Sequence, residues 1–325
     1  MHTSDAIQSA QSLLKGRSLL KISDLSESEI RTVLLQGGRL KRASAEGRLT
    51  PILEGKTLAL IFEKPSLRTR VTFEVAMTRL GGRSIYLAPA DIQLGKRESV
   101  EDVSRSLSRW VDGIAARTFA HETVVRLAES GSIPVVNALS DLEHPCQALA
   151  DLLTIAEHRC GTTEEPDFSG IKLAFVGDGN NVANSLLVIS ASVGMSMTLA
   201  RPDGYGPDEG VLQEALSIAS RTGARIQVTN DPREAVRDAD VVYTDVWTSM
   251  GQEEEREARL QAFRGWCVTA ELMKLAKPDA IVMHCLPAHR GEEIAAEVID
   301  GPQSVVFDQA ENRLHAQMGL LSFLL

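Results

Sequence analysis

Short apolar runs alternate with longer amphipathic stretches along most of the chain. In the longer stretches the apolar residues recur at helical spacing, as at Ile30, Val33, Leu34 and Leu40. Strands that alternate with helices in this way indicate parallel sheets whose faces are covered by helices. The predicted strands are residues 57–61, 84–87, 113–117, 133–137, 172–176, 196–200, 225–229, 241–244, 280–283 and 305–307.

Helices are predicted between many of these strands and at both ends of the chain. The segment 160–166 is polar and rich in turn residues, which predicts a domain boundary near it. We expect an α/β protein with two doubly wound parallel-sheet domains joined by interdomain helices. The domains are residues 1–150 and 151–310, and a C-terminal helix, 311–325, packs back on the first domain. The predicted helices are residues 23–47, 66–80, 98–110, 144–159, 182–193 and 312–325.

The composition restricts the possible partners of the chain. Its 325 residues suffice for two domains that each bury a core, and a hydrophobic content of 43% is ordinary for a globular protein. The net charge of -10 disfavours nucleic acid and anionic membrane as partners, because both need a basic surface. No apolar stretch is long enough to cross a bilayer and no export signal precedes the first helix, so we expect a cytoplasmic protein.

The cysteines indicate neither a zinc site nor a disulfide framework. They are far apart in the sequence and form no C-x-x-C pair. We expect all four to be reduced thiols: Cys146, Cys160, Cys267 and Cys285.

The first predicted strand leads into a helix start that suits an anion. A hydroxyl residue directly after Pro65 is typical of a helix N-cap, which assigns Ser66 to that position. The unpaired N–H groups of a helix start, with the side chains of Arg68, Thr69 and Arg70, would hold a phosphate group well. The alternative is that Ser66 only caps the helix and that the arginines are solvated.

The turn Gly177-Asp178-Gly179 follows another predicted strand and suggests a dinucleotide site. However, Val182 stands where G-x-G-x-x-G has its third glycine, and no acidic residue clearly ends the next strand. A nicotinamide site is therefore not expected. The turn can still place Asn181 at a cleft, because ligands of open α/β sheets bind beyond the carboxyl ends of the strands.

His144 and Gln147 share one face of the first turn of a predicted helix, which has Pro145 at its favoured first position. With Arg117, at the expected end of a strand, His144 could polarise a carbonyl oxygen. The structural alternatives are a capping histidine and an arginine in a salt bridge.

Two later strand ends also carry polar residues. Asp245 opens the loop 245–251, in which a carboxylate and a hydroxyl suit an ammonium group; the alternative is an ordinary surface loop. His284 and Cys285 follow another strand, but a metal site there lacks partner ligands at suitable spacing. A thiol beside a proline is more often packed than nucleophilic.

Together these motifs resemble those of the aspartate/ornithine carbamoyltransferase family, over nearly the whole chain from about Leu19 onward. The phosphate motif is shared across the family, whereas S-M-G and H-C-L-P resemble its ornithine branch. The matching motifs, in the order of the family, are S-x-R-T-R at 66–70, Arg117, H-P-x-Q at 144–147, Gly177 to Asn181, D-x-x-x-S-M-G at 245–251, H-C-L-P at 284–287 and Glu311-Asn312-Arg313.

The resemblance implies transfer of the carbamoyl group of carbamoyl phosphate to the δ-amine of L-ornithine, which gives L-citrulline and phosphate without a metal or organic cofactor. It also implies a homotrimer or a higher multiple of trimers, with sites at subunit interfaces and a domain closure. The implied catalytic residues are Arg117, His144, Cys285 and Arg313. The implied carbamoyl phosphate ligands are Ser66, Leu67 through its backbone, Arg68, Thr69, Gln93, Arg117, His144, Gln147, Cys285, Leu286 and Arg313. The implied ornithine ligands are Asn181, Asp245, Ser249 and Met250.

Two other functions stay open. A sister enzyme could carbamoylate putrescine, N-acetylornithine or another amine, although Asp245 and the S-M-G motif favour an acceptor with an α-amino-acid group. A non-catalytic paralogue would keep the fold, but loss of a motif residue would be expected in it. Arg68, Arg117, His144 and Cys285 are all intact.

Overall fold

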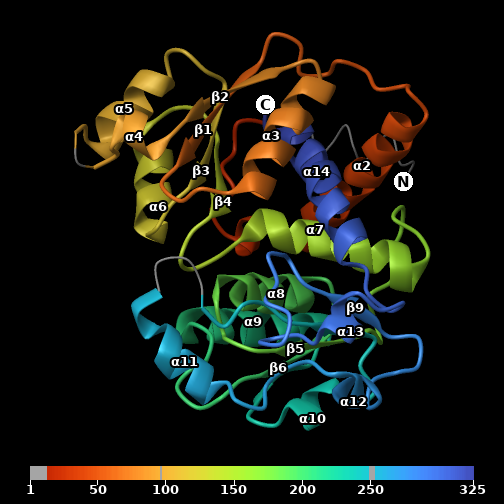
Figure 1. Cartoon of the computed structure of the whole chain (residues 1–325). Helices are drawn as coiled ribbons and strands as arrows, with labels where there is room; N and C mark the ends of the chain where they lie inside the picture. Colours follow the sequence, from red (N-terminus) through yellow and green to blue (C-terminus); the bar gives the residue numbers. More distant parts are fainter. Residues whose placement is uncertain (1–12, 96, 249–252) are drawn as a thin grey trace. The chain divides into compact units, whose positions relative to one another are not determined.

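The structure, a computed structural model, describes residues 13–95, 97–248 and 253–325. The chain forms two compact units, and each is built on its own parallel sheet (Figure 1). Unit 1 comprises the described residues up to Leu153, Thr163–Glu165 and Asn312–Leu325, and unit 2 comprises Thr154–Thr162 and Pro166–Glu311.

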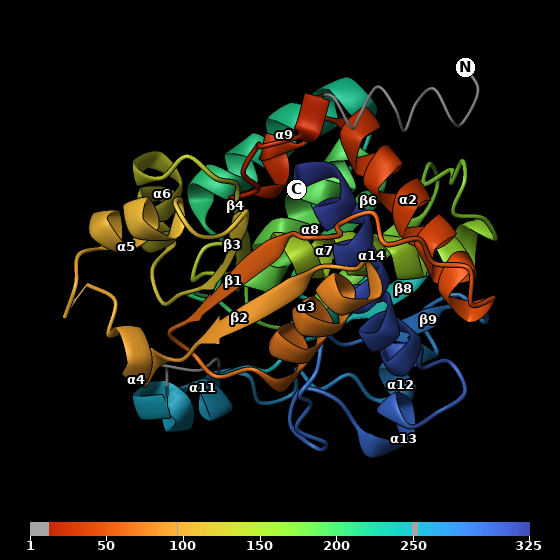
Figure 2. The same ribbon diagram turned by 90° about the horizontal axis from the view of Figure 1, so that it is seen from above.

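The sheet of unit 1 consists of the parallel strands β1 (Thr57–Phe62), β2 (Arg83–Leu87), β3 (Gly113–Arg117) and β4 (Val135–Leu139). Their order across the sheet is β2-β1-β3-β4 (Figure 2). The two central strands are apolar without alternation, because helices cover both of their faces. From β1 the chain builds outward to β2 and then returns to the other side of β1, so the switch point of this sheet lies between β1 and β3.

Helices cover both faces of this sheet (Figure 1, Figure 2). On one face, α5 (Val100–Leu107) and α6 (His121–Ser130) pack side by side and share a buried cluster with β1 and β3. On the other face lie α2 (Glu27–Ala45), α3 (Leu67–Arg79) and α14 (Val306–Leu324), whose last part belongs to unit 1. The remaining helices are α4 (Pro89–Ile92), a short 3-10 turn η1 (Ile22–Asp24) and α7 (Pro145–Ile155), which starts in unit 1 at the predicted Pro145.

Two glycines let α2 and α14 approach within backbone contact. A Cβ atom on Gly319 would lie 2.7 Å from the Val33 carbonyl oxygen and 2.8 Å from the Gly37 nitrogen. A Cβ atom on Gly37 would lie 3.0 Å from the carbonyl oxygen of His315. A methyl group does not fit at Gly319, and at Gly37 it would require the facing backbone to shift, so the two glycines allow α14 to pack closely on α2.

The sheet of unit 2 consists of β5 (Lys172–Val176), β6 (Ser196–Ala200), β7 (Ile226–Thr229), β8 (Val241–Tyr243) and β9 (Ile281–Met283). All strand pairs are parallel and their order is β7-β6-β5-β8-β9. The switch point therefore lies between β5 and β8. The prediction from the sequence of two doubly wound parallel-sheet domains is confirmed.

The helices of unit 2 are shorter on average than those of unit 1. None of the helices in the described part of the chain is long and apolar enough to cross a membrane. The helical segments in the described part of unit 2 are the π-helical turn η2 (Ala156–Cys160), α8 (Asn181–Ser192), α9 (Glu209–Thr222), α10 (Pro232–Val236), the 3-10 turn η3 (Glu253–Glu255), α11 (Arg256–Ala262), α12 (Ala270–Met273) and α13 (Ala296–Ile299).

The last predicted strand, 305–307, is wrong. Ser304 forms an isolated bridge with Val282 of β9, and Val305 donates its N–H to the Val282 carbonyl at 3.0 Å. The chain then turns at once into α14, which begins at Val306 and not at residue 312. Val305 and Val306 are buried by this helix start, so their apolar character did not require a strand.

Candidate active site

Both sheets bring polar residues to their switch points. In unit 1, β1 leads into the start of α3, and β3 ends at Arg117. In unit 2, β5 leads into the turn before α8, and β8 leads toward Asp245. Because ligands of open α/β sheets bind at switch points, each unit has one candidate site.

The start of α3 forms one side of the candidate site in unit 1. Ser66 caps the helix as predicted, since its Oγ accepts the Thr69 N–H at 3.3 Å and donates to Thr69 Oγ1 at 3.0 Å. Leu67 is 75% exposed and is the first residue of α3, where the backbone N–H groups have no partner within the helix and can donate to a ligand. Arg70 forms an ion pair with Glu74 at 2.9 Å and is directed along the helix.

Arg313, from α14, joins two elements at this site. Its Nη2 donates to Thr69 Oγ1 and its Nη1 donates to Gln147 Oε1, both at 2.9 Å. Gln147 is oriented in turn by Asp151, whose Oδ1 accepts from Gln147 Nε2 at 2.7 Å. All four side chains are buried. Asp151 was missed in the sequence, although its spacing of four from Gln147 on a helix was the available signal.

His144 and Arg117 complete the site in unit 1 and are 3% and 7% exposed. Burial, followed by the positive charges of Arg313 and Arg117, holds the pKa of His144 well below its usual range. The imidazole is therefore neutral at neutral pH and can donate one hydrogen bond without adding charge. The name anion cluster is used below for Ser66, Thr69, Arg117, His144, Gln147 and Arg313.

Two other predicted anion ligands, Arg68 and Gln93, have different surroundings. Arg68 is half-buried in the first turn of α3 and directly precedes Thr69 of the anion cluster. Gln93 has a positive φ of 47° and, with Glu63 and Phe119, lines a hollow of about 540 Å³. None of the described residues that line this hollow belongs to the anion cluster.

In unit 2, residues that follow β5, β8 and β9 form a second polar group. Asn180 Nδ2 donates to Asp245 Oδ2 at 2.8 Å, and Cys285 Sγ donates to Asp245 Oδ1 at 3.1 Å. Asn180 also caps α8, since its Oδ1 accepts from two backbone N–H groups of that helix. The name carboxylate cluster is used below for Asn180, Asp245 and Cys285.

The sequence analysis predicted Asn181 as a ligand, and the neighbouring Asn180 is a member of the carboxylate cluster. Asn181 is the first residue of α8 and is half-buried, whereas Asn180 makes the described contact with Asp245. The signal for Asn180 was the preference of helix N-caps for asparagine. The predicted ligands Ser249 and Met250 lie outside the described residues.

A buried ion pair supports the loop that follows Asp245. Arg259 Nη1, on α11, donates to Asp178 Oδ2 at 2.8 Å and to the Trp247 carbonyl at 3.0 Å. Burial raises the pKa of Asp178 to about 6, although Arg259 opposes this shift. Arg259 was missed because it lies 81 positions from Asp178, beyond the reach of any local pattern.

His284 lies next to the carboxylate cluster and is fully buried. Its Nδ1 accepts the Leu286 N–H at 2.9 Å, and its Nε2 lies 3.0 Å from Glu293 Oε1. The fold gives His284 and Cys285 the third donor that the sequence spacing lacked, because donor atoms of these two residues and Asp245 lie within 4.8 Å of one another. Since both ring nitrogens of His284 are already hydrogen-bonded, the histidine would have to give up one bond to bind a metal.

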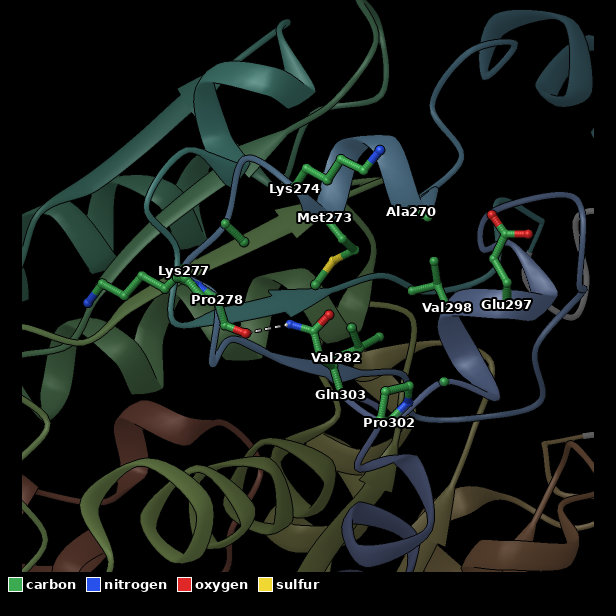
Figure 3. Close-up of a pocket in the computed structure, with 12 residues that line it drawn as sticks. Ala270, Met273, Lys274, Lys277, Pro278, Val282, Glu297, Val298, Pro302 and Gln303 are labelled. Atoms are coloured by element: carbon green, nitrogen blue, oxygen red, sulfur yellow. Dashed lines mark hydrogen bonds between the residues drawn. The ribbon is translucent and has the colours of Figure 1, made fainter.

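Unit 2 contains a hollow of about 360 Å³, which lies between α12 and α13 (Figure 3). Met273, Val282 and Val298 line it, and Gln303 Nε2 donates to the Pro278 carbonyl at its edge at 3.4 Å. None of the described residues that line it is a predicted site residue, so it is not part of the candidate active site.

Two family models together match most of the chain. Residues 17–157 match the carbamoyl-P binding domain of aspartate/ornithine carbamoyltransferase, and residues 169–324 match its Asp/Orn binding domain. The chain belongs to the aspartate/ornithine carbamoyltransferase family. In this carbamoyltransferase, Arg313 lies within the range of the second domain model but folds as part of unit 1.

Individual relatives of this carbamoyltransferase cover nearly its whole length. It is 54% identical over 309 residues to ornithine carbamoyltransferase of Acidothermus cellulolyticus, which covers 95% of this chain and 96% of the relative. It is 58% identical over 281 residues to that of Methanothermobacter thermautotrophicus, with 86% and 91% covered. The solved ornithine carbamoyltransferase of Pyrococcus furiosus matches with a TM-score of 0.92 and 51% identity, and the match covers 96% of this chain and 97% of that one.

Proposed function

We propose that this carbamoyltransferase transfers the carbamoyl group of carbamoyl phosphate to the δ-amine of L-ornithine, as a step of arginine metabolism. The observation that carries the proposal is the pairing of opposite chemistries at the two switch points. The anion cluster presents two buried guanidinium groups, and the carboxylate cluster presents a buried carboxylate. The names of the relatives, at about half identity over nearly the whole chain, support ornithine as the acceptor.

In unit 1, the start of α3 and its arginines hold the phosphate group. Backbone N–H groups of the first helical turn and the hydroxyls of Ser66 and Thr69 donate to phosphate oxygens, and Arg68 adds a charged fork. Arg117, His144 and Arg313 direct donors at the carbamoyl oxygen, where negative charge develops in the transition state. Gln147, held by Arg313 and Asp151, orients the carbamoyl group.

In unit 2, the carboxylate cluster holds the amino-acid end of ornithine. Asp245 accepts from the α-ammonium group, and Asn180 and Cys285 fix the carboxylate in position. Asn181, Ser249 and Met250 are further ligands of the amino acid, and Cys285 and Leu286 lie near the reacting amine. An acceptor without the α-amino-acid group would leave the buried Asp245 carboxylate without an ammonium partner, which is the basis for selectivity.

The reaction forms one C–N bond and breaks one C–O bond. The neutral δ-amine attacks the carbamoyl carbon, the carbonyl oxygen takes up negative charge, and phosphate leaves with the electron pair of the broken C–O bond. The proton lost by the amine passes to phosphate or to water, so no electron transfer is needed. Holding both substrates converts a bimolecular reaction into an effectively unimolecular one.

We also propose that the protein is a cytoplasmic homotrimer or a higher multiple of trimers, in which Gln93 of one copy reaches the anion cluster of the next. The assignment is supported by the separation of Gln93 from the anion cluster, since none of the described residues that line its hollow belongs to that cluster. None of the four cysteines forms a disulfide, which supports a reducing compartment. Mass measurement in solution tests the assembly. The turnover of a Gln93→Ala variant tests the contribution of Gln93.

The deciding experiment is citrulline and phosphate release from carbamoyl phosphate, with ornithine, putrescine, N-acetylornithine and aspartate offered in parallel. Turnover is expected with ornithine alone. Arg68→Ala should abolish turnover, and Asp245→Asn should raise the KM for ornithine about 100-fold, since it removes a charged hydrogen bond worth about 3 kcal/mol. The matched control is Asp203→Asn, because Asp203 is an exposed carboxylate of unit 2 paired with Arg201.

Turnover with another amine would retain the carbamoyl phosphate site and overturn the assignment of Asp245. Absence of turnover with every amine would favour a non-catalytic paralogue.

A further inference from the structure

The segment after β9 has an unusual backbone beside the carboxylate cluster. Leu286 has a φ of +58°, in the left-handed region that bulky residues avoid. Its neighbour Cys285 donates to Asp245 Oδ1 at 3.1 Å. A residue held in such a conformation requires surroundings that fix it, and such residues concentrate at functional sites.

The ring of His284 supplies that support. Its Nδ1 accepts the N–H of Leu286, two residues later, at 2.9 Å. This contact resembles an Asx-turn, in which an asparagine side chain accepts the backbone N–H of the residue two positions later. A nitrogen that accepts carries no proton, so the proton of the neutral imidazole is on Nε2.

Glu293 fixes the ring from its other side. Glu293 Oε1 lies 3.0 Å from His284 Nε2 and also accepts the His289 N–H at 2.6 Å. Both side chains are fully buried. The His284 backbone N–H donates to Gln309 Oε1 at 2.9 Å, and Gln309 Nε2 donates to the Tyr243 hydroxyl at 3.0 Å. The histidine is thus held at its backbone and at both ring nitrogens.

We propose that Glu293 and His284 are positioning residues that act through the Leu286 N–H to hold Cys285 and Leu286 in place for the transfer step. Glu293 orients the ring and selects its tautomer, and the ring fixes the backbone that follows Cys285. Neither side chain touches substrate. This inference rests on the proposed function only for its effect on citrulline formation, since the hydrogen-bond chain itself is independent of the acceptor.

Two substitutions of His284 separate the two ring contacts. His284→Asn keeps an acceptor that can reach the N–H two residues later, but it is too short to reach Glu293. His284→Gln can reach Glu293 through its amide nitrogen, but its longer side chain does not close the local turn. If the Leu286 contact positions Cys285, the glutamine variant should lose about 10- to 100-fold in kcat with ornithine, and the asparagine variant should lose much less.

The glutamate is tested in the same way. Glu293→Gln keeps an oxygen acceptor for both donors and should retain most of the activity, whereas Glu293→Leu removes it and should behave like His284→Gln. The matched control is Glu292→Gln, the same change one position earlier, at a partly exposed residue paired with Arg256. This control should match the parent chain in kcat.

Alkylation of thiols by iodoacetamide, resolved by peptide mass spectrometry, gives a readout that needs no substrate. Cys285 should react severalfold faster in His284→Gln and Glu293→Leu than in the parent chain. Cys160, which donates to the Asp167 carbonyl at 3.2 Å in another part of unit 2, is the internal reference and should not change. The affinity of unit 1 for inorganic phosphate should also stay the same.

Equal losses of kcat in His284→Asn and His284→Gln would overturn the proposal. An unchanged rate of Cys285 alkylation in His284→Gln and Glu293→Leu would also overturn it. If His284→Gln does not fold, which its melting curve will show, Glu293→Leu compared with Glu293→Gln decides the question. If the parent chain makes no citrulline, the proposed function fails, and the alkylation rates still decide whether the histidine positions Cys285.

Discussion

The anion cluster and the carboxylate cluster are built in different ways. The members of the anion cluster come from β3, from α14 and from the starts of α3 and α7. Arg313 links α3 to α7 through contacts that span 244 and 166 positions of the chain. The carboxylate cluster comes only from segments that directly follow three neighbouring strands. The anion cluster thus depends on a side chain from a distant helix, and the carboxylate cluster depends on local backbone geometry.

Each cluster carries a charge opposite to that of its proposed ligand. Arg117 and Arg313 are buried in unit 1, and burial of His144 together with their positive charges holds the pKa of this histidine well below its usual range. Asp245 is buried in unit 2 and is reached by uncharged donors, Asn180 and Cys285. A phosphate and an ammonium group would each find its own unit, so the two substrates are sorted by charge before any finer contact is made.

The strongest test of this contrast is Arg313→Ala. It removes two charged hydrogen bonds and leaves Thr69 and Gln147 buried without that donor. We expect kcat/KM for carbamoyl phosphate to fall about 10²- to 10³-fold and the free energy of unfolding to fall by about 3 kcal/mol. Kinetics and urea unfolding measure the two effects.

Arg126→Ala is the matched control, because Arg126 is a half-exposed arginine of unit 1 that pairs with Glu101. Unchanged carbamoyl phosphate kinetics in Arg313→Ala would show that the link between α14 and α3 does not serve the anion site.

The second test uses pH. The δ-amine of free ornithine has a pKa close to that of lysine, about 10, so the attacking neutral form becomes about tenfold more abundant per pH unit below it. We expect kcat/KM for ornithine to rise by up to about 100-fold between pH 6.5 and 8.5. His144 contributes nothing to this rise, because its lowered pKa keeps it neutral throughout that range.

The same pKa of His144 predicts the direction of acid denaturation. The unfolded chain binds a proton at this histidine near pH 6.5, whereas the folded chain does not. The free energy of unfolding should therefore fall as the pH drops below about 6.5, and the fall should be smaller in His144→Asn.

A profile of kcat/KM for ornithine that is flat from pH 6.5 to 8.5 would contradict the assignment of the kinetic rise to the amine.

The smallest expected effect concerns the loop after Asp245. Arg259→Leu removes the donor to the Trp247 carbonyl and the partner of Asp178. We expect the KM for ornithine to rise about tenfold, equivalent to about 1.4 kcal/mol, with the KM for carbamoyl phosphate unchanged. Arg256→Leu is the matched control on the same helix, since Arg256 is half-exposed and pairs with Glu292. Equal changes in both KM values would show that Arg259 acts on the whole protein and not on unit 2 alone.

The parts of the fold that follow from local pattern were predictable from the sequence. The strand at 113–117 and that at 172–176 were predicted with their observed bounds, because a buried parallel strand is a short apolar run that ends at turn residues. The cap at Ser66 and the helix start at Pro145 follow from the preferences of single positions. The error at 305–307 arose because a short apolar run does not distinguish a strand from the buried start of a helix.

The connections of the site were less predictable than its members. His144 and Arg117 were identified from strand and helix ends, but nothing local indicates that Arg313 bonds Thr69. The contacts of Asp245 with Asn180 and Cys285 depend likewise on the order of strands in the sheet, which a single sequence does not specify. Sequence patterns thus gave candidate residues, and topology decided which of them meet.

The contact between Thr69 and Arg313 has a consequence for how the protein is made. The ribosome synthesises Thr69 long before Arg313, which follows 244 positions later. Unit 1 of a growing chain can form its sheet early, but its anion cluster lacks one guanidinium group until α14 has emerged and Gly319 of α14 has packed against Gly37 of α2. Contacts at such separations form late in folding. We therefore expect a nascent chain to gain affinity for carbamoyl phosphate only at the end of its synthesis, after most of unit 2 has been made.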